Sequence, residues 1–207
     1  MKRNKNNNLP LSGVNVLDLT NVLSGPYATL ILAELGANVI KVEKPDGDDS
    51  RKYGPFIGNK SGYFLSLNRG KKSIVIDLKK KSDRIVFNKL LSKVDVLVDN
   101  FKPGSLEKFG FSWSKISKKY PKLIHAKISG FGEDGPYKSY PAYDIIVQAM
   151  GGIMSLTGSK KNDFVRVGTS IGDIVAGLFC VIGILSQLLK RKETNIGSKL
   201  DLSMLDC

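Results

Sequence analysis

Asp173 is the side chain whose type and position most clearly indicate chemistry. It ends the segment Gly168-Thr-Ser-Ile-Gly-Asp173 and directly precedes an apolar run over residues 174–189. A helix dipole stabilises an ionised carboxylate at the N-terminus of the helix, and an ionised carboxylate directed into a cleft can act as a nucleophile. The competing interpretation is structural, because Asp is also a preferred N-cap that accepts a hydrogen bond from a free backbone N–H.

The other residue types that carry out chemistry form no recognisable set. His125 is the only histidine, and its apolar neighbours in a strand-like run favour a structural role. Cys180 and Cys207 are the only cysteines and lack the spacing of a disulfide framework or a metal site. We therefore predict no metal ion and no Ser-His-Asp or Cys-His catalytic set.

The first strand–helix–strand pattern is typical of dinucleotide-binding domains as well. Glu43 ends the second predicted strand, where Rossmann domains place the acid that holds a ribose hydroxyl. The turn after the first strand, Thr20-Asn-Val-Leu-Ser-Gly-Pro26, has one glycine where the G-x-G-x-x-G motif has three. Without those glycines the backbone cannot approach a pyrophosphate in the usual way, so we predict no bound NAD.

Alternating strand and helix patterns predict the elements that position Asp173. Residues 1–9 are polar and are expected to form a disordered N-terminus, followed by one domain over residues 10–207. Strands that alternate with helices are typical of an α/β fold with a Rossmann-like parallel sheet. The predicted strands span residues 14–19, 38–43, 73–78, 94–99, 123–128 and 199–203. The predicted helices span residues 26–35, 82–92, 143–150 and 174–189, with short helices near Leu106 and Trp113.

The charge balance narrows the kinds of partner. The formal net charge is +13, which fits a nucleic-acid binder, a solvated lysine-rich surface or a site for a small molecule with several phosphates. The lysines occur in short runs such as Lys71-Lys72 and Lys79-Lys80-Lys81, which favours the last two interpretations. The apolar run over residues 174–189 is shorter than the roughly 20 residues of a membrane span, and no signal peptide follows Lys2-Arg3. We therefore expect a cytoplasmic protein with no membrane or nucleic-acid partner and with residues 174–189 as a buried core helix.

Several segments in a fixed order together resemble the family III CoA-transferases. This family includes formyl-CoA transferase, carnitine CoA-transferase and the α-methylacyl-CoA racemases. The resemblance covers residues 9–207, nearly the whole chain. The segments that carry it are Leu11-Ser-Gly-Val-Asn-Val-Leu-Asp-Leu, Gly36-Ala-Asn-Val-Ile-Lys-Val-Glu43, Asn100-Phe-Lys-Pro-Gly104, Tyr143-Asp-Ile-Ile-Val-Gln-Ala149, Gly168-Thr-Ser-Ile-Gly-Asp173 and Leu200-Asp-Leu-Ser-Met-Leu-Asp206.

The resemblance implies that Asp173 is the nucleophile of a transfer between an acyl-CoA and a carboxylic acid. Its carboxylate would attack the donor thioester and later carry CoA as an aspartyl-CoA thioester. CoA is then a substrate, and no permanently bound cofactor is expected. The family also implies an interlocked homodimer and a second, smaller domain beyond residue 207.

The same resemblance implies a CoA site along the ends of several strands. Phe101 is expected to pack on the adenine, Lys44, Lys79 and Lys108 to meet the phosphates, and Tyr143 to approach the thioester. The residues implied in CoA binding are Val22, Leu23, Ser24, Lys44, Ile76, Asp77, Leu78, Lys79, Asn100, Phe101, Lys102, Lys108 and Tyr143.

Three of these residues depart from the family pattern. Lys44 and Lys108 replace arginines of some members, which keeps the charge and loses the bidentate geometry. Leu23 stands where formyl-CoA transferases carry Gln, which disfavours formate or oxalate as the acid.

Two alternatives to transfer are compatible with these motifs. The racemase branch uses a Gly-His-Asp motif to remove an α-proton, and the matching segment is Ala142-Tyr-Asp144. Tyrosine, with a pKa of about 10, is a poor base at neutral pH, which favours transfer over racemisation. The other alternative is an inactive CoA-binding fragment, because residues 203–207 resemble the opening of a helix and the chain then ends.

Overall fold

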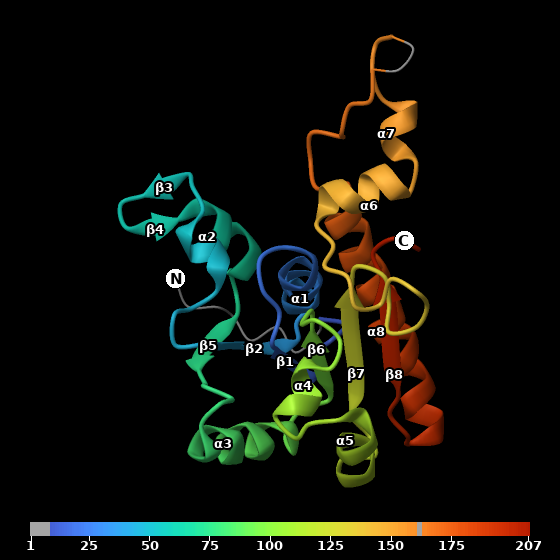
Figure 1. The fold of residues 1–207 in the computed structure, drawn as a ribbon. Coiled ribbons are helices and arrows are strands. Elements are labelled where there is room, and N and C mark those ends of the chain that lie inside the picture. Colours follow the sequence, from blue (N-terminus) through green and yellow to red (C-terminus); the bar gives the residue numbers. More distant parts are fainter. Residues whose placement is uncertain (1–8, 161–162) are drawn as a thin grey trace.

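Six parallel strands form one sheet within residues 9–160 and 163–207, the part of the chain that the computed structural model describes (Figure 1). The strand order is β5-β2-β1-β6-β7-β8. Counted along the chain this is 3-2-1-4-5-6, the order of doubly wound Rossmann domains, so the predicted α/β fold is confirmed. Residues 1–8 of the predicted disordered N-terminus lie outside the described residues. The strands are β1 (Asn15–Asp18), β2 (Asn38–Glu43), β5 (Lys72–Val75), β6 (Val96–Asp99), β7 (Ile124–Ser129) and β8 (Lys199–Ser203).

Helices cover both faces of this sheet, which explains why its central strands are apolar on both sides. In β6, Val96 and Val98 belong to one hydrophobic cluster and Leu97 to the other. The first cluster includes residues of α1 (Ser24–Glu34) and α8 (Ile171–Thr194). The second includes residues of α3 (Lys81–Leu91), α4 (Ser105–Lys108) and α5 (Trp113–Lys119).

Gly177 lets α8 approach the start of α1 closely. A Cβ atom at this position would lie 2.8 Å from the carbonyl oxygen of Ser24 and 3.1 Å from the Tyr27 ring. Asp173 stands one helical turn before Gly177 on the same face of α8. The close packing of the two helices therefore brings the Asp173 end of α8 against the first turn of α1.

Gly177→Ala is expected to push α8 away from α1 and to misplace Asp173. We expect a loss of about 1–3 kcal/mol in the free energy of unfolding, as for other overpacked cores. Urea unfolding measures this loss. Gly183→Ala is the matched control in the same helix, because its Cβ would meet only the end of the Leu200 side chain, at 3.2 Å. Equal effects of the two substitutions would contradict this role of Gly177.

Within the described residues, α8 is the one helix long and apolar enough to cross a membrane. Length and composition alone do not separate such a span from a core helix. One face of α8, with Ala176, Cys180 and Ile184, is buried in the first cluster. The predicted core helix is therefore confirmed for this face. The opposite face leaves Phe179 and Ile182 about half exposed.

Some short elements and boundaries differ from the sequence-based prediction. The helix α8 begins at Ile171, three residues before the predicted start, and residues 204–206 form a turn in place of the predicted helix opening. In this turn Ser203 Oγ accepts a hydrogen bond from the Asp206 N–H. The unpredicted elements are the 3-10 helix η1 (Asp49–Lys52), the hairpin of β3 (Phe56–Ile57) and β4 (Lys60–Ser61), and the helices α2 (Gly62–Asn68) and α7 (Ile153–Leu156). They are too short to give a periodic pattern.

Candidate active site

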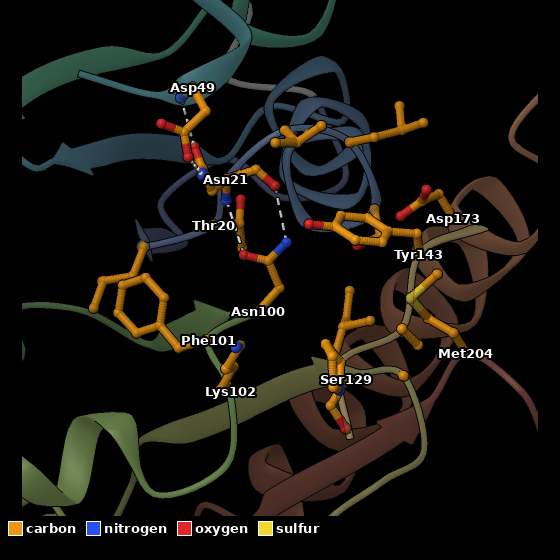
Figure 2. Close-up of a pocket in the computed structure, with 18 of the residues that line it drawn as sticks. Thr20, Asn21, Asp49, Asn100, Phe101, Lys102, Ser129, Tyr143, Asp173 and Met204 are labelled. Atoms are coloured by element: carbon orange, nitrogen blue, oxygen red, sulfur yellow. Dashed lines mark hydrogen bonds between the residues drawn. The ribbon is translucent and has the colours of Figure 1, made fainter. Parts of the chain in front are cut away.

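A cleft of about 590 Å³ opens at the carboxyl ends of β1, β2, β6 and β7. The chain reverses its direction across the sheet between β1 and β6, and ligands of doubly wound domains bind at such a point. The helix α6 (Asp144–Met150) and the start of α8 border the other side of the cleft. Figure 2 shows Asp173 and Tyr143 at one end of the cleft, and Phe101 and Lys102 at the other.

Two asparagines join the strand ends at the floor of the cleft. The Asn21 N–H donates to Asn100 Oδ1 over 2.8 Å, and Asn100 Nδ2 donates to the Asn21 carbonyl over 2.9 Å. The Asn21 side chain in turn donates to Asp49 and accepts from the Asp49 N–H (Figure 2). This network fixes the turn that leads into α1, in which Val22 has a φ of 67°. A positive φ is costly for a β-branched residue, so the turn depends on these contacts.

Asp173 is the third residue of α8, and the interpretation of this residue as an N-cap is wrong. The N-cap is Ser170, which makes no capping hydrogen bond through its side chain. Asp144, at the start of α6, provides the cap because its Oδ1 accepts from the Gly172 N–H over 2.8 Å. Gln148 Nε2 donates a hydrogen bond to the other oxygen of Asp144, Oδ2, over 2.6 Å. The Asp173 carboxylate is therefore free to line the cleft.

The electrostatic setting of Asp173 also differs from the prediction. Burial raises the pKa of its carboxyl from 3.8 to about 6, and the nearby Asp144 carboxylate adds to the rise. Hydrogen bonding by Ser24 acts in the opposite direction without cancelling it. The helix dipole thus does not dominate. A carboxylate with this pKa is ionised at neutral pH and more basic than an exposed aspartate, which suits a nucleophile.

The structure brings together nine of the residues predicted for the site and leaves five outside the cleft. Of those five, Ile76 and Leu78 are buried in the second cluster, and Asp77 accepts a hydrogen bond from the Lys79 N–H in the turn before α3. Lys79 and Lys108 are exposed. The nine that line the cleft are Val22, Leu23, Ser24, Lys44, Asn100, Phe101, Lys102, Tyr143 and Asp173.

Other polar residues of the cleft have no predicted role. Asn21 and Asp49 build its floor, and Lys138 adds a cation from the loop before α6. Asn21 follows β1 directly, and this position at the end of a central parallel strand is the signal that could have identified it. Lys44 lies at the cleft and pairs with Asp49 over 2.6 Å while remaining half exposed.

The described residues contain no group of three or more His, Cys, Asp or Glu side chains that could hold a metal ion. His125 is buried at 4% exposure and pairs with Asp99 through its Nε2 over 2.6 Å, away from the cleft lining.

The chain belongs to CoA-transferase family III, whose model matches residues 11–207. It is 49% identical over 199 residues to acetyl-CoA:oxalate CoA-transferase of Acetobacter aceti, with 95% of this chain and 51% of that protein covered. It is 43% identical over 198 residues to succinyl-CoA:glutarate CoA-transferase of Mus musculus, with 95% and 45% covered. A solved CAIB/BAIF family protein from Brucella suis superposes with a TM-score of 0.92 at 40% identity, covering 96% of this chain and 54% of that one. The chain thus spans about half the length of the curated relatives it matches.

Proposed function

We propose that this chain provides the CoA-binding cleft and the nucleophile of an enzyme that transfers CoA from an acyl-CoA to a carboxylic acid. The observation that carries the proposal is the Asp173 carboxylate, which lines the cleft, does not cap α8 and has a raised pKa of about 6. The family membership supports CoA as the group that is transferred. The activities for which the relatives are named support a dicarboxylic acid, such as oxalate or glutarate, as acceptor or donor. Oxalate is included here although Leu23 led us to expect that it is disfavoured.

The proposed reaction has four steps that use one carboxylate. An Asp173 oxygen attacks the thioester carbonyl of the donor, which forms a mixed anhydride and releases CoA thiolate. The thiolate attacks the Asp173 side-chain carbonyl, which forms the aspartyl-CoA thioester and releases the donor acid. The acceptor carboxylate then attacks this thioester, and the thiolate released attacks the acceptor carbonyl of the new anhydride. Asp173 is regenerated as a carboxylate. The four easier steps together replace one difficult direct transfer.

The cleft supplies groups for both ends of the CoA molecule. Lys44 and Lys102 provide positive charge for phosphates, and the Phe101 ring provides a surface for the adenine. Tyr143 lies at the Asp173 end of the cleft, where the thioester would sit (Figure 2). The residue is 78% exposed, so substrate can cover it. The resemblance further implies an interlocked homodimer, and light scattering of the purified protein tests this oligomeric state.

One incubation with two measurements, of new acyl-CoA and of deuterium at the α-carbon, distinguishes racemisation from transfer. The protein is incubated with an acyl-CoA and a panel of mono- and dicarboxylates in D₂O. Formation of a new acyl-CoA without deuterium at the α-carbon is the expected result. Deuterium incorporation without transfer would replace the proposal with the racemase alternative. If the chain binds CoA but carries out neither reaction, the inactive CoA-binding fragment is favoured.

The transfer rate is expected to depend on pH through Asp173. Only the ionised carboxylate attacks the thioester, and its pKa is about 6. The rate should therefore be flat above pH 7 and fall about tenfold per pH unit well below pH 6. A profile of kcat/KM from pH 5 to pH 8 measures this dependence. An inflection near pH 4, where an exposed aspartate titrates, would contradict the raised pKa.

A further inference from the structure

Lys127 and Asp99 form a buried pair behind the Phe101 end of the cleft. Asp99 ends β6 and Lys127 is its partner in the register of β7, so their side chains lie on the same face of the sheet. Lys127 Nζ donates to Asp99 Oδ1 over 2.9 Å. The side chains are 3% and 0% exposed, respectively. A lysine in the middle of a buried strand is unusual and requires such a partner.

This pair binds both peptide groups of Phe101. The Phe101 N–H donates to Asp99 Oδ1 over 3.0 Å, and the Phe101 carbonyl accepts from Lys127 Nζ over 3.0 Å. The preceding residue, Asn100, is held by Asn21 through two further hydrogen bonds. The backbone on both sides of the Phe101 ring is therefore fixed before any ligand enters.

We propose that Lys127 is a positioning residue that holds Phe101 ready to stack on the adenine of CoA. The inference rests on the proposed function, in which this ring packs on the nucleotide. A flat base binds an aromatic ring more tightly when the ring does not have to be ordered on binding. Lys127 does not line the cleft, so it acts only through the backbone of Phe101, by its bond to the carbonyl and by its pairing with Asp99. It should affect ligands that carry the adenine and leave shorter ligands unaffected.

The test compares CoA with 4′-phosphopantetheine, which lacks the adenosine part of CoA. Calorimetry measures the Kd of both ligands for the unmutated chain and for Lys127→Met. We expect CoA to bind about tenfold more weakly to the variant, which corresponds to about 1.4 kcal/mol, and phosphopantetheine to bind equally. A loss of equal size for the two ligands would overturn the inference, since it would indicate a general structural defect.

Two further variants keep the test independent of folding. Lys127→Met leaves the Asp99 charge buried with His125 as its remaining side-chain partner. The double variant Asp99→Asn with Lys127→Met removes both charges of the Lys127–Asp99 pair together, a change that buried pairs often tolerate. This double variant should show the same loss that is specific to CoA. Arg191→Met is the matched control, because Arg191 donates to the Asp95 and Lys122 carbonyls next to the amino ends of β6 and β7, at the other end of the strands from the cleft. It should bind both ligands as the unmutated chain does.

A double-mutant cycle with Phe101→Ala completes the test. If Lys127 acts through the ring, Lys127→Met should cause no further loss of CoA affinity in the Phe101→Ala background. An undiminished effect in that background would overturn the inference. Failure of the unmutated chain to bind CoA would instead overturn the proposed function, whereas CoA binding that is equal in all these proteins would overturn the role of Lys127 alone.

Discussion

Asp173→Asn is expected to reduce acyl transfer by about three orders of magnitude or more while the chain remains folded. The amide has nearly the shape of the carboxylate and cannot form the anhydride or the thioester. The hydrogen bond that caps α8 comes from Asp144, so the fold loses no cap in the variant. The measurement is kcat/KM for an acyl-CoA and an acceptor acid. Normal turnover of the variant would contradict the assignment of Asp173 as the nucleophile.

The same variant is expected to unfold at a higher urea concentration at pH 7.5. The folded pKa of about 6 lies above the ordinary value of 3.8, so ionisation of Asp173 makes the folded state less stable as the pH rises between these two values. The amide does not ionise, and its advantage should therefore be present above pH 6 and absent below pH 4. Asp134→Asn, at an exposed aspartate of the loop before α6, is the control and should change stability by less than about 0.5 kcal/mol at either pH.

Lys71→Met is expected to lower the free energy of unfolding by about 3–5 kcal/mol, the usual cost of breaking a buried ion pair. The Lys71 side chain is 1% exposed and pairs with Asp18, which is fully buried. Its Nζ also donates to the Pro26 carbonyl, Thr29 Oγ1 and Asn68 Oδ1 over 2.8–2.9 Å. Removal of the ammonium leaves these oxygens without their donor and the Asp18 charge with less compensation.

Two controls test this prediction: a variant that breaks an exposed ion pair, and the pH dependence of the effect of Lys71→Met. Arg69→Met removes an exposed pair, since Arg69 and Glu34 are more than half exposed, and should cost less than about 1 kcal/mol. Lys71 and other partners lower the pKa of Asp18 to about 2, so the benefit of the pair is present above pH 4 and is lost as the pH falls toward 2. The difference in the free energy of unfolding between Lys71→Met and the unmutated chain should therefore become smaller as the pH falls over this range. Equal costs of the Lys71 and Arg69 substitutions would contradict a structural role for the buried lysine.

Periodic apolar patterns predict the sheet well because its central strands are buried on both faces. The runs around Val16, Val39, Val98 and Ile124 each became a strand, and the connection pattern determined a parallel sheet. Asp173, the proposed nucleophile, was also singled out, because it stands at a loop–helix junction within a recognisable segment, and the structure places it in the cleft lining. These features depend on neighbours in the chain, which a single sequence displays.

Contacts between distant residues were not predictable in the same way. The cap of α8 comes from Asp144, 28 residues before Gly172, so a residue next to the helix was the natural but wrong choice. Lys71 belongs to a lysine run that resembled a solvated or phosphate-binding surface, and it is instead buried against Asp18. Lys79 and Lys108 carry the predicted charge but are not part of the cleft lining, whereas Lys138 lines the cleft from a loop with no periodic pattern.

The most direct test of the central claim is to trap the covalent intermediate on Asp173. The protein is incubated with an acyl-CoA, treated with hydroxylamine or borohydride, digested and mapped by mass spectrometry. Attack on an anhydride or thioester of the side chain gives a hydroxamate with hydroxylamine and an alcohol with borohydride. We predict that the modification is found at Asp173 and is absent from Asp173→Asn. Turnover by the unmutated protein with Asp173 unmodified under both reagents would contradict the account.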